Sequence, residues 1–131
     1  MNVLVIYSHT YHSRSYAGKA ILEVLEAQPG ITVRNLEELY PDNSPIDIAA
    51  EQAALVAADI IVFQHPLFWF ATPALLKRYM DEVLQYGFAY GDDSFKLAGK
   101  KFVHSYTTGA AAEVYIGGLH QNAEAALIAT A

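Results

Sequence analysis

Apolar runs that alternate with amphipathic helical patterns constrain this sequence most strongly. Val3–Tyr7 and Ile60–Gln64 are short runs rich in β-branched residues, which is typical of strands buried on both faces. Ser15–Ala27, Asp47–Ala58 and the segment after Pro73 carry apolar residues at helical spacing. Because strand and helix alternate, we expect an α/β fold with a parallel sheet, helices on both faces and right-handed crossovers.

Two further strands are less apolar. Ile31–Asn35 and Lys101–Tyr106 predict a more exposed second and fourth strand, and Gln121–Thr130 predicts a final helix. Thr72 is expected to cap the helix that follows it, with Pro73 at the first helical position. At 131 residues the chain is long enough for one domain, residues 1–131, with its own core.

Composition excludes several classes of protein. The net charge of −6 and only eight scattered basic residues argue against nucleic-acid binding. The absence of cysteine excludes disulfides and thiolate metal sites, and isolated histidines make a zinc site improbable, so no metal is expected. No apolar stretch reaches the roughly 20 residues of a membrane helix, and no basic leader precedes the first strand. We therefore expect a cytoplasmic protein.

The loops that follow the first, third and fourth strands have unusual compositions. In a parallel sheet such loops meet beyond the carboxyl ends of the strands, where ligands bind. The first loop, Ser8–Ser15, is rich in hydroxyls and leads straight into a helix. A helix N-terminus favours an anion, so this loop could hold a phosphate monoester. The alternative is a loop in which Ser13 or Ser15 only caps the helix.

The second loop, His65–Pro73, places three consecutive aromatic residues between two prolines. A short connection cannot bury all three rings, which favours a platform for a flat ligand. A hydrophobic loop tucked under a neighbouring element, or a dimer patch, is the alternative. The third loop, Thr107–Ala112, offers hydroxyls and small residues that allow close approach of a ligand edge, or it is an ordinary flexible loop. Together the three loops suit flavin mononucleotide (FMN).

Three segments carry a resemblance to a known family. The segment HPLFWFATPALLKRYMDEVLQYGFAYG, the SHTYHSRS loop and the TTG after the fourth strand resemble the NAD(P)H:quinone oxidoreductase family. Within that family the chain is most similar to the group of modulator of drug activity B and the ancillary protein of the glutathione-regulated potassium-efflux system, which LYPDNSPIDIAAEQAAL also matches. The resemblance implies a flavodoxin-like doubly wound sheet of strand order 2-1-3-4, a homodimer, and bound FMN or FAD. It also implies two-electron transfer from NADH or NADPH to quinones.

The resemblance also implies which residues form the site. His9, Ser15, Tyr16, Ala17 and Gly18 would hold the phosphate end of the flavin. The ring would lie against Leu67, Phe68, Trp69 and Phe70, with Thr107, Thr108, Gly109 and Ala110 at its edge. Tyr115 and His120 would face the substrate and act as the catalytic residues.

Three features depart from the family pattern. Gly18 stands where many relatives have Asn, and Ala110 where many have a second Gly, which predicts weaker contacts to phosphate and ring. The spacing from Tyr115 to His120 is one residue shorter than in better-known relatives. The chain ends in the helix after the fourth strand, whereas relatives continue through a fifth strand and a last helix, so it is a fragment or a shortened chain, or a neighbour covers that edge.

Two other functions remain open at this point. The chain could be a regulatory ancillary subunit that binds a potassium-efflux transporter, in which case it would be peripheral at the inner membrane. It could also be a shortened chain that has lost flavin affinity. The choices between FMN and FAD, and between NADH and NADPH, stay open as well.

Overall fold

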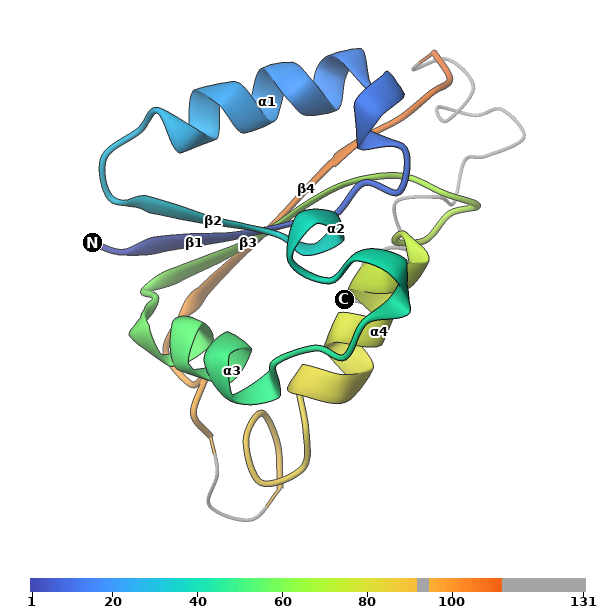
Figure 1. Cartoon of the computed structure of the whole chain (residues 1–131). Coiled ribbons are helices and arrows are strands. Elements are labelled where there is room, and N and C mark those ends of the chain that lie inside the picture. Colours follow the sequence, from blue (N-terminus) through green and yellow to red (C-terminus); the bar gives the residue numbers. More distant parts are fainter. Residues whose placement is uncertain (92–94, 112–131) are drawn as a thin grey trace.

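The computed structural model describes residues 1–91 and 95–111, and they form a single parallel sheet flanked by helices. The strands are β1 (Val3–Tyr7), β2 (Ile31–Asn35), β3 (Ile60–Pro66) and β4 (Lys101–Thr107). The helices are α1 (Tyr16–Glu26), α2 (Leu36–Leu39), α3 (Ile48–Ala57) and α4 (Ala74–Val83), with 3₁₀ turns η1 (His12–Arg14) and η2 (Pro41–Asn43). Figure 1 shows α1 on one face of the sheet and α3 and α4 on the other.

The strand order is β2-β1-β3-β4, and all three pairings are parallel. This order confirms the predicted flavodoxin-like topology, and β1 and β3 occupy the centre of the sheet as their uniform apolarity predicted. Alternate residues of β1 face opposite cores. Leu4 and Ile6 pack with α3 and α4, whereas Val5 and Tyr7 pack with Leu22 of α1.

The structure differs from the sequence-based boundaries at four elements. The sequence predicts Thr72 as N-cap and Pro73 as first helical residue, whereas α4 begins at Ala74 with Pro73 as its N-cap, so Thr72 does not cap it. Strand β3 continues through Pro66 and β4 through Thr107, because each added residue pairs with the neighbouring strand. The short helix α2 follows β2 directly and has no counterpart in the sequence-based prediction, since four residues are too few for a periodic pattern. The predicted helix Gln121–Thr130 lies outside the described residues.

A buried ion pair fixes the α2–α3 region against the sheet. The carboxylate of Glu51 is fully buried and accepts hydrogen bonds from Arg34 of β2 at 2.6 and 2.8 Å and from the Tyr40 hydroxyl at 2.5 Å. The hydrogen bonds to Glu51 raise the pKa of Arg34, so its guanidinium stays charged. This network holds in place the segment that follows the carboxyl end of β2.

Candidate functional site

The first predicted loop is held at both of its ends. Ser15 is the N-cap of α1, and its hydroxyl accepts a hydrogen bond from the Gly18 N–H at 2.9 Å. This leaves the N–H groups of Tyr16 and Ala17 in the first helical turn, where the helix itself supplies no acceptor. Tyr16 is 91% exposed, so its ring lies in solvent and only its backbone is placed for a ligand.

Glu37 fixes the beginning of the same loop from a different part of the chain. Its carboxylate accepts a hydrogen bond from the Ser8 hydroxyl at 2.8 Å and another from the His9 N–H at 2.9 Å. Glu37 lies in α2, beyond the carboxyl end of β2, so it ties two neighbouring strand ends together. Glu37 could not be identified from the sequence, because it is separated from Ser8 by 29 positions and from His9 by 28, and no local pattern spans that distance.

His9 presents one defined nitrogen. Its Nδ1 accepts a hydrogen bond from the Tyr11 N–H at 3.1 Å, which leaves the proton of the neutral ring on Nε2. Burial lowers the pKa of His9, and nearby His12 lowers it further, so the ring is neutral at pH 7. A neutral His9 is therefore a hydrogen-bond donor through Nε2, a role that suits a phosphate oxygen.

Gly18 lies at the most crowded point of this loop. A Cβ atom there would lie 2.5 Å from the Tyr7 hydroxyl, 2.6 Å from Ser15 Oγ and 3.2 Å from His9 Cδ2. The Tyr7 hydroxyl also contacts His12 Nδ1 at 2.6 Å, and its pKa is raised to about 12 by burial and by Glu37, so it remains protonated and donates. In this chain glycine is thus required by the packing of the loop itself.

Positive charge is present beside the helix N-terminus. The Lys19 Nζ atom donates to the Ser13 carbonyl at 2.6 Å, which places its ammonium group over the loop. The Arg14 guanidinium lies 4.7 Å from the centre of the Tyr11 ring. Lys19 and Arg14 thus both bring positive charge to this end of α1.

The second loop forms a tight turn with an unusual backbone. Phe68 and Ala71 exchange two backbone hydrogen bonds of 3.0 Å, so Trp69 and Phe70 are the central residues. Their φ angles are +50° and +61°, a left-handed conformation that bulky residues rarely adopt and that costs roughly 1–2 kcal/mol per residue. The turn leaves the Trp69 side chain 94% exposed, while Leu67, Phe68 and Phe70 are half-buried.

The second loop contacts both of the others. The Phe68 ring meets His9 edge-on with centroids 5.9 Å apart, and Tyr11 with centroids 6.0 Å apart. On its other side the Leu67 N–H donates to the Thr107 carbonyl at 2.8 Å. The three loops therefore meet at one end of the sheet, as the topology predicted.

The third loop is more open. Thr107 ends β4, and the Thr108 hydroxyl donates to the Ala110 carbonyl at 3.1 Å. Thr108 and Gly109 are exposed and Ala110 is half-buried. Among the residues that the structure describes, none lies within 4 Å of a Cβ atom placed at Gly109. The predicted catalytic residues Tyr115 and His120 lie outside the described residues.

Two histidines lie beneath the site. His65 Nδ1 donates to the Pro66 carbonyl at 2.7 Å, so its Nε2 accepts the proton of His104 Nε2, 2.6 Å away. Burial lowers the pKa of His65 to about 4 and also lowers that of His104, so the pair is neutral near pH 7. This contact links β4 to the end of β3, just before the aromatic loop.

The geometry suits a ligand with an anionic end and a flat apolar body. Hydrogen-bond donors converge at the start of α1, and an exposed aromatic turn lies next to them, so the residues present fit FMN. Within residues 1–91 and 95–111, no group of three or more His, Asp or Glu side chains is arranged to hold a metal ion. In the same residues no helix has the length and apolar character needed to span a bilayer.

Comparison with known proteins defines the class. The family model described as a flavodoxin-like fold matches residues 1–129, and the chain belongs to this family. Among curated proteins it is 47% identical over 107 residues to the glutathione-regulated potassium-efflux system ancillary protein KefF of Klebsiella aerogenes. That match covers 82% of this chain and 60% of KefF, so the chain spans less than two thirds of the relative's length.

Solved structures with the same fold carry names that describe different activities. General stress protein 14 of Treponema denticola in complex with FMN superposes with a TM-score of 0.89, at 33% identity, over 99% of this chain and 78% of that one. An NADPH-quinone reductase from P. pentosaceus gives 0.80 at 28% identity, covering 92% and 68%. A structure described as a thermophilic tryptophan halogenase from Streptomycin violaceusniger gives 0.87 at 39%, covering 97% and 76%. Because one fold carries several activities, function has to be argued from the site.

Proposed function

We propose that this chain binds FMN and catalyses two-electron reduction of quinones by NADH or NADPH. The observation that carries the proposal is the meeting of the three loops, in which Phe68 contacts His9 while Leu67 is hydrogen-bonded to Thr107. FMN is preferred to FAD because the first loop offers one compact phosphate site and a structural neighbour is described as an FMN complex. When bound, the flavin supplies hydride acceptance and donation.

We assign different parts of the flavin and the substrate to different residues. The N–H groups of Tyr16 and Ala17 and the His9 Nε2–H would hold the phosphate, with Lys19 balancing its charge. The exposed Trp69 turn would orient the ring and exclude water from one face, and the open backbone around Gly109 would approach its edge. From the resemblance alone, Tyr115 and His120 would hydrogen-bond the quinone oxygen as negative charge develops.

Titration with FMN tests the binding step. Purified protein should gain the bound-flavin absorbance with a saturable Kd, and Trp69→Asn should weaken binding by about tenfold or more. Asn tolerates the left-handed backbone at position 69, so this variant keeps the turn while it removes the ring. If FMN does not bind the wild-type chain, or if Trp69→Asn binds as well as wild type, the proposed slot is wrong.

Turnover tests the reaction. The FMN-loaded protein should oxidise NADH or NADPH only when a quinone such as menadione is present, with parallel-line kinetics that indicate one shared site. A flavin-loaded His120→Ala variant should reduce quinone more slowly without losing flavin. Unchanged steady-state rates would remove His120 from the proposed mechanism.

A second function is favoured by the similarity to KefF, whose name assigns it to a potassium-efflux system. In that case a cytoplasmic homodimer would bind a potassium-efflux transporter at the inner membrane. Copurification with such a transporter, and measurement of mass in solution, test these two parts separately. The roles are compatible, so a protein that both reduces quinones and binds the transporter would support both.

A further inference from the structure

One carboxylate holds the first loop from outside that loop. Glu37 accepts a hydrogen bond from the Ser8 hydroxyl on Oε1 at 2.8 Å and from the His9 N–H on Oε2 at 2.9 Å. Each of its oxygens therefore has one donor from the loop, and a carboxylate has no proton to donate to a phosphate. Its negative charge would repel an anion bound nearby. The position of Glu37 beside an anion site therefore points to a role that it exerts through the loop.

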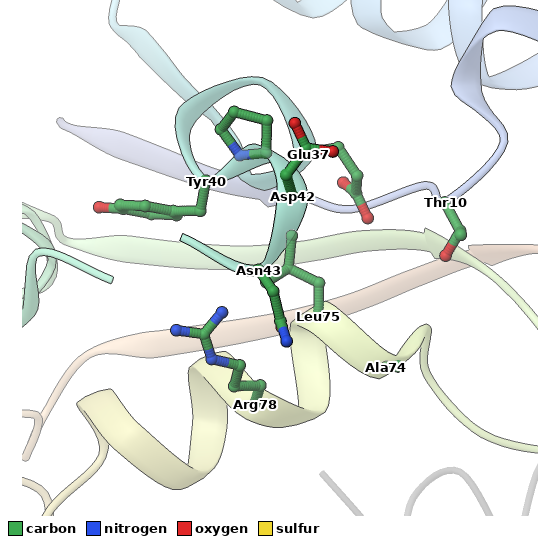
Figure 2. Close-up of a pocket in the computed structure, with 9 residues that line it drawn as sticks. Thr10, Glu37, Tyr40, Asp42, Asn43, Ala74, Leu75 and Arg78 are labelled. Carbon is green, nitrogen blue, oxygen red and sulfur yellow. The ribbon is translucent and has the colours of Figure 1, made fainter. Parts of the chain in front are cut away.

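The Glu37 carboxylate is anchored in the core of the protein. Its helix α2 begins with Leu36, which is fully buried, and the Tyr40 N–H donates to the Leu36 carbonyl at 2.8 Å. The Tyr40 hydroxyl in turn donates to the buried Glu51 carboxylate at 2.5 Å. Figure 2 shows the Glu37 side chain on the side of α2 that faces Thr10, whereas the Tyr40 ring points to the opposite side. The position of Glu37 is thus set by contacts outside the first loop.

The contact with Glu37 helps to determine where the His9 ring points. The His9 backbone N–H donates to Glu37, its Nδ1 accepts from the Tyr11 N–H at 3.1 Å, and its ring meets Phe68 edge-on. His9 is buried, so these contacts leave its ring little freedom. Its Cδ2, the ring atom next to Nε2, lies 3.2 Å from the place that a Cβ atom of Gly18 would occupy. The Nε2 edge of the ring therefore faces the first turn of α1.

We propose that Glu37 is a positioning residue for the phosphate group of FMN and that it acts through His9. By fixing the backbone of Ser8 and His9, the carboxylate directs the His9 Nε2–H toward the first turn of α1, where the phosphate would bind. Carboxylate and phosphate repel each other, so the favourable contribution of Glu37 has to be geometric. This inference rests on the proposed function, because it requires a flavin whose phosphate binds at that turn.

Two substitutions of Glu37 separate geometry from charge. Glu37→Ala removes both hydrogen bonds. Glu37→Gln removes the charge but can keep both contacts, because the amide oxygen accepts from the His9 N–H while the amide NH₂ donates to the Ser8 oxygen. Glu37 is half-buried and lines a cavity of about 490 Å³, so its truncation enlarges an existing space and opens no void in the core. Glu38→Ala is the matched control, because Glu38 is an exposed carboxylate in the same helix.

The Kd values of FMN and riboflavin, measured by quenching of flavin fluorescence, provide the test. Riboflavin lacks the phosphate group. Glu37→Ala should weaken FMN binding by about tenfold or more, because a hydrogen bond to a charged group is lost, and should leave riboflavin binding unchanged. Glu37→Gln should recover most of the lost FMN affinity. Glu38→Ala should bind both flavins like wild type.

Several results would overturn this inference while the chain still binds FMN. These are an unchanged FMN affinity in Glu37→Ala, an equal loss for FMN and riboflavin, a Glu37→Gln variant as weak as Glu37→Ala, and an equal loss in Glu38→Ala. The second of these would indicate a merely structural effect. A wild-type chain that does not bind FMN would instead overturn the proposed function, and this inference with it.

A double-mutant cycle tests whether Glu37 acts through His9. His9→Ala removes the Nε2–H donor, so adding Glu37→Ala to that variant should weaken FMN binding much less than it does in the wild-type background. Circular dichroism verifies that each variant is folded. If the two substitutions weaken FMN binding by independent factors that multiply in the double variant, Glu37 does not act through His9.

Discussion

Gly18 is a residue at which the identity of the side chain decides local packing. The Tyr7 hydroxyl and Ser15 Oγ occupy the space that a side chain would need, so the chain's departure from the Asn of many relatives is tied to this arrangement. The expectation that this glycine weakens phosphate contacts is untested. What the geometry establishes is that Tyr7, His9 and Ser15 converge on the first turn of α1.

We predict that Gly18→Ala destabilises the protein. The added Cβ forces Tyr7 and Ser15 apart, and overpacking of this kind costs about 1–3 kcal/mol in the free energy of unfolding. Urea denaturation followed by circular dichroism measures it. Gly109→Ala is the matched control, because within residues 1–91 and 95–111 its Cβ meets nothing closer than 4 Å, and it should unfold at the wild-type urea concentration. Equal stability of Gly18→Ala and wild type would show that Tyr7 and Ser15 leave room for a Cβ atom at position 18.

At the scale of secondary-structure elements, buried polar contacts fix the positions of neighbouring helices and strands relative to one another more specifically than apolar packing does. Glu51 of α3 joins β2 through Arg34 and joins the end of α2 through Tyr40. His65 and His104 join β3 to β4. Both contacts lie next to a strand end that supports the candidate site.

Replacement of Glu51 by Gln should be strongly destabilising. The substitution leaves the half-buried Arg34 charge without its partner, and breaking a buried ion pair in this way costs about 3–5 kcal/mol. Because Arg34 is partly exposed to solvent, we expect a smaller loss here, of about 2 kcal/mol in the free energy of unfolding. Chemical denaturation measures the loss. The Lys77–Asp81 pair on the surface of α4 is the comparison, and Asp81→Asn should change stability by less than about 0.5 kcal/mol. If Glu51→Gln and Asp81→Asn lowered stability equally, the burial of the Arg34–Glu51 pair would not explain its contribution.

Acidification should weaken the contact between β3 and β4. The pKa of His65 falls from 6.5 to about 4 on folding, so between these values the unfolded chain binds a proton that the folded chain does not. The free energy of unfolding therefore decreases as pH falls through this window, by up to about 3 kcal/mol, and recovers above pH 6.5. His65→Gln lacks this titration and should lose less stability between pH 6.5 and 4. Parallel stability profiles for the two proteins would argue against a buried neutral His65.

On the scale of the whole molecule, the parallel sheet brings distant loops to one end. The first and second loops belong to the adjacent strands β1 and β3, and the third follows β4, so their contacts depend on strand order alone. The proposed ligand would contact all three loops, and it would bind the folded chain but not the unfolded one. Ligand binding is therefore linked to global stability.

FMN should accordingly raise the melting temperature. At a free concentration one hundred times Kd, binding contributes about 2.7 kcal/mol, which corresponds to a rise of about 5–10 °C for a chain of this size. Differential scanning fluorimetry or calorimetry across a range of FMN concentrations measures the dependence. Riboflavin, which lacks the phosphate, should give a smaller rise if the start of α1 binds that group. Equal rises with both compounds would remove the phosphate from the proposed site.

Local patterns were sufficient to predict much of this architecture. Apolar runs identified β1 and β3, and the order of strands and helices, together with the resemblance, gave the topology that the structure confirms. The unusual compositions of the three loops also pointed to the end of the sheet where they meet. These features could be predicted because periodicity and loop composition are properties of contiguous residues.

Tertiary structure alone decided how the candidate site is built. The contact of Glu37 with Ser8 and His9 and the edge-on packing of Phe68 against His9 depend on residues far apart in the sequence. Hydrogen bonds and steric exclusion between such residues exist only after the strands have paired and the helices have packed. The sequence by itself determined which elements form and how they are ordered, and three-dimensional packing determined which polar atoms are satisfied and which remain available to a ligand.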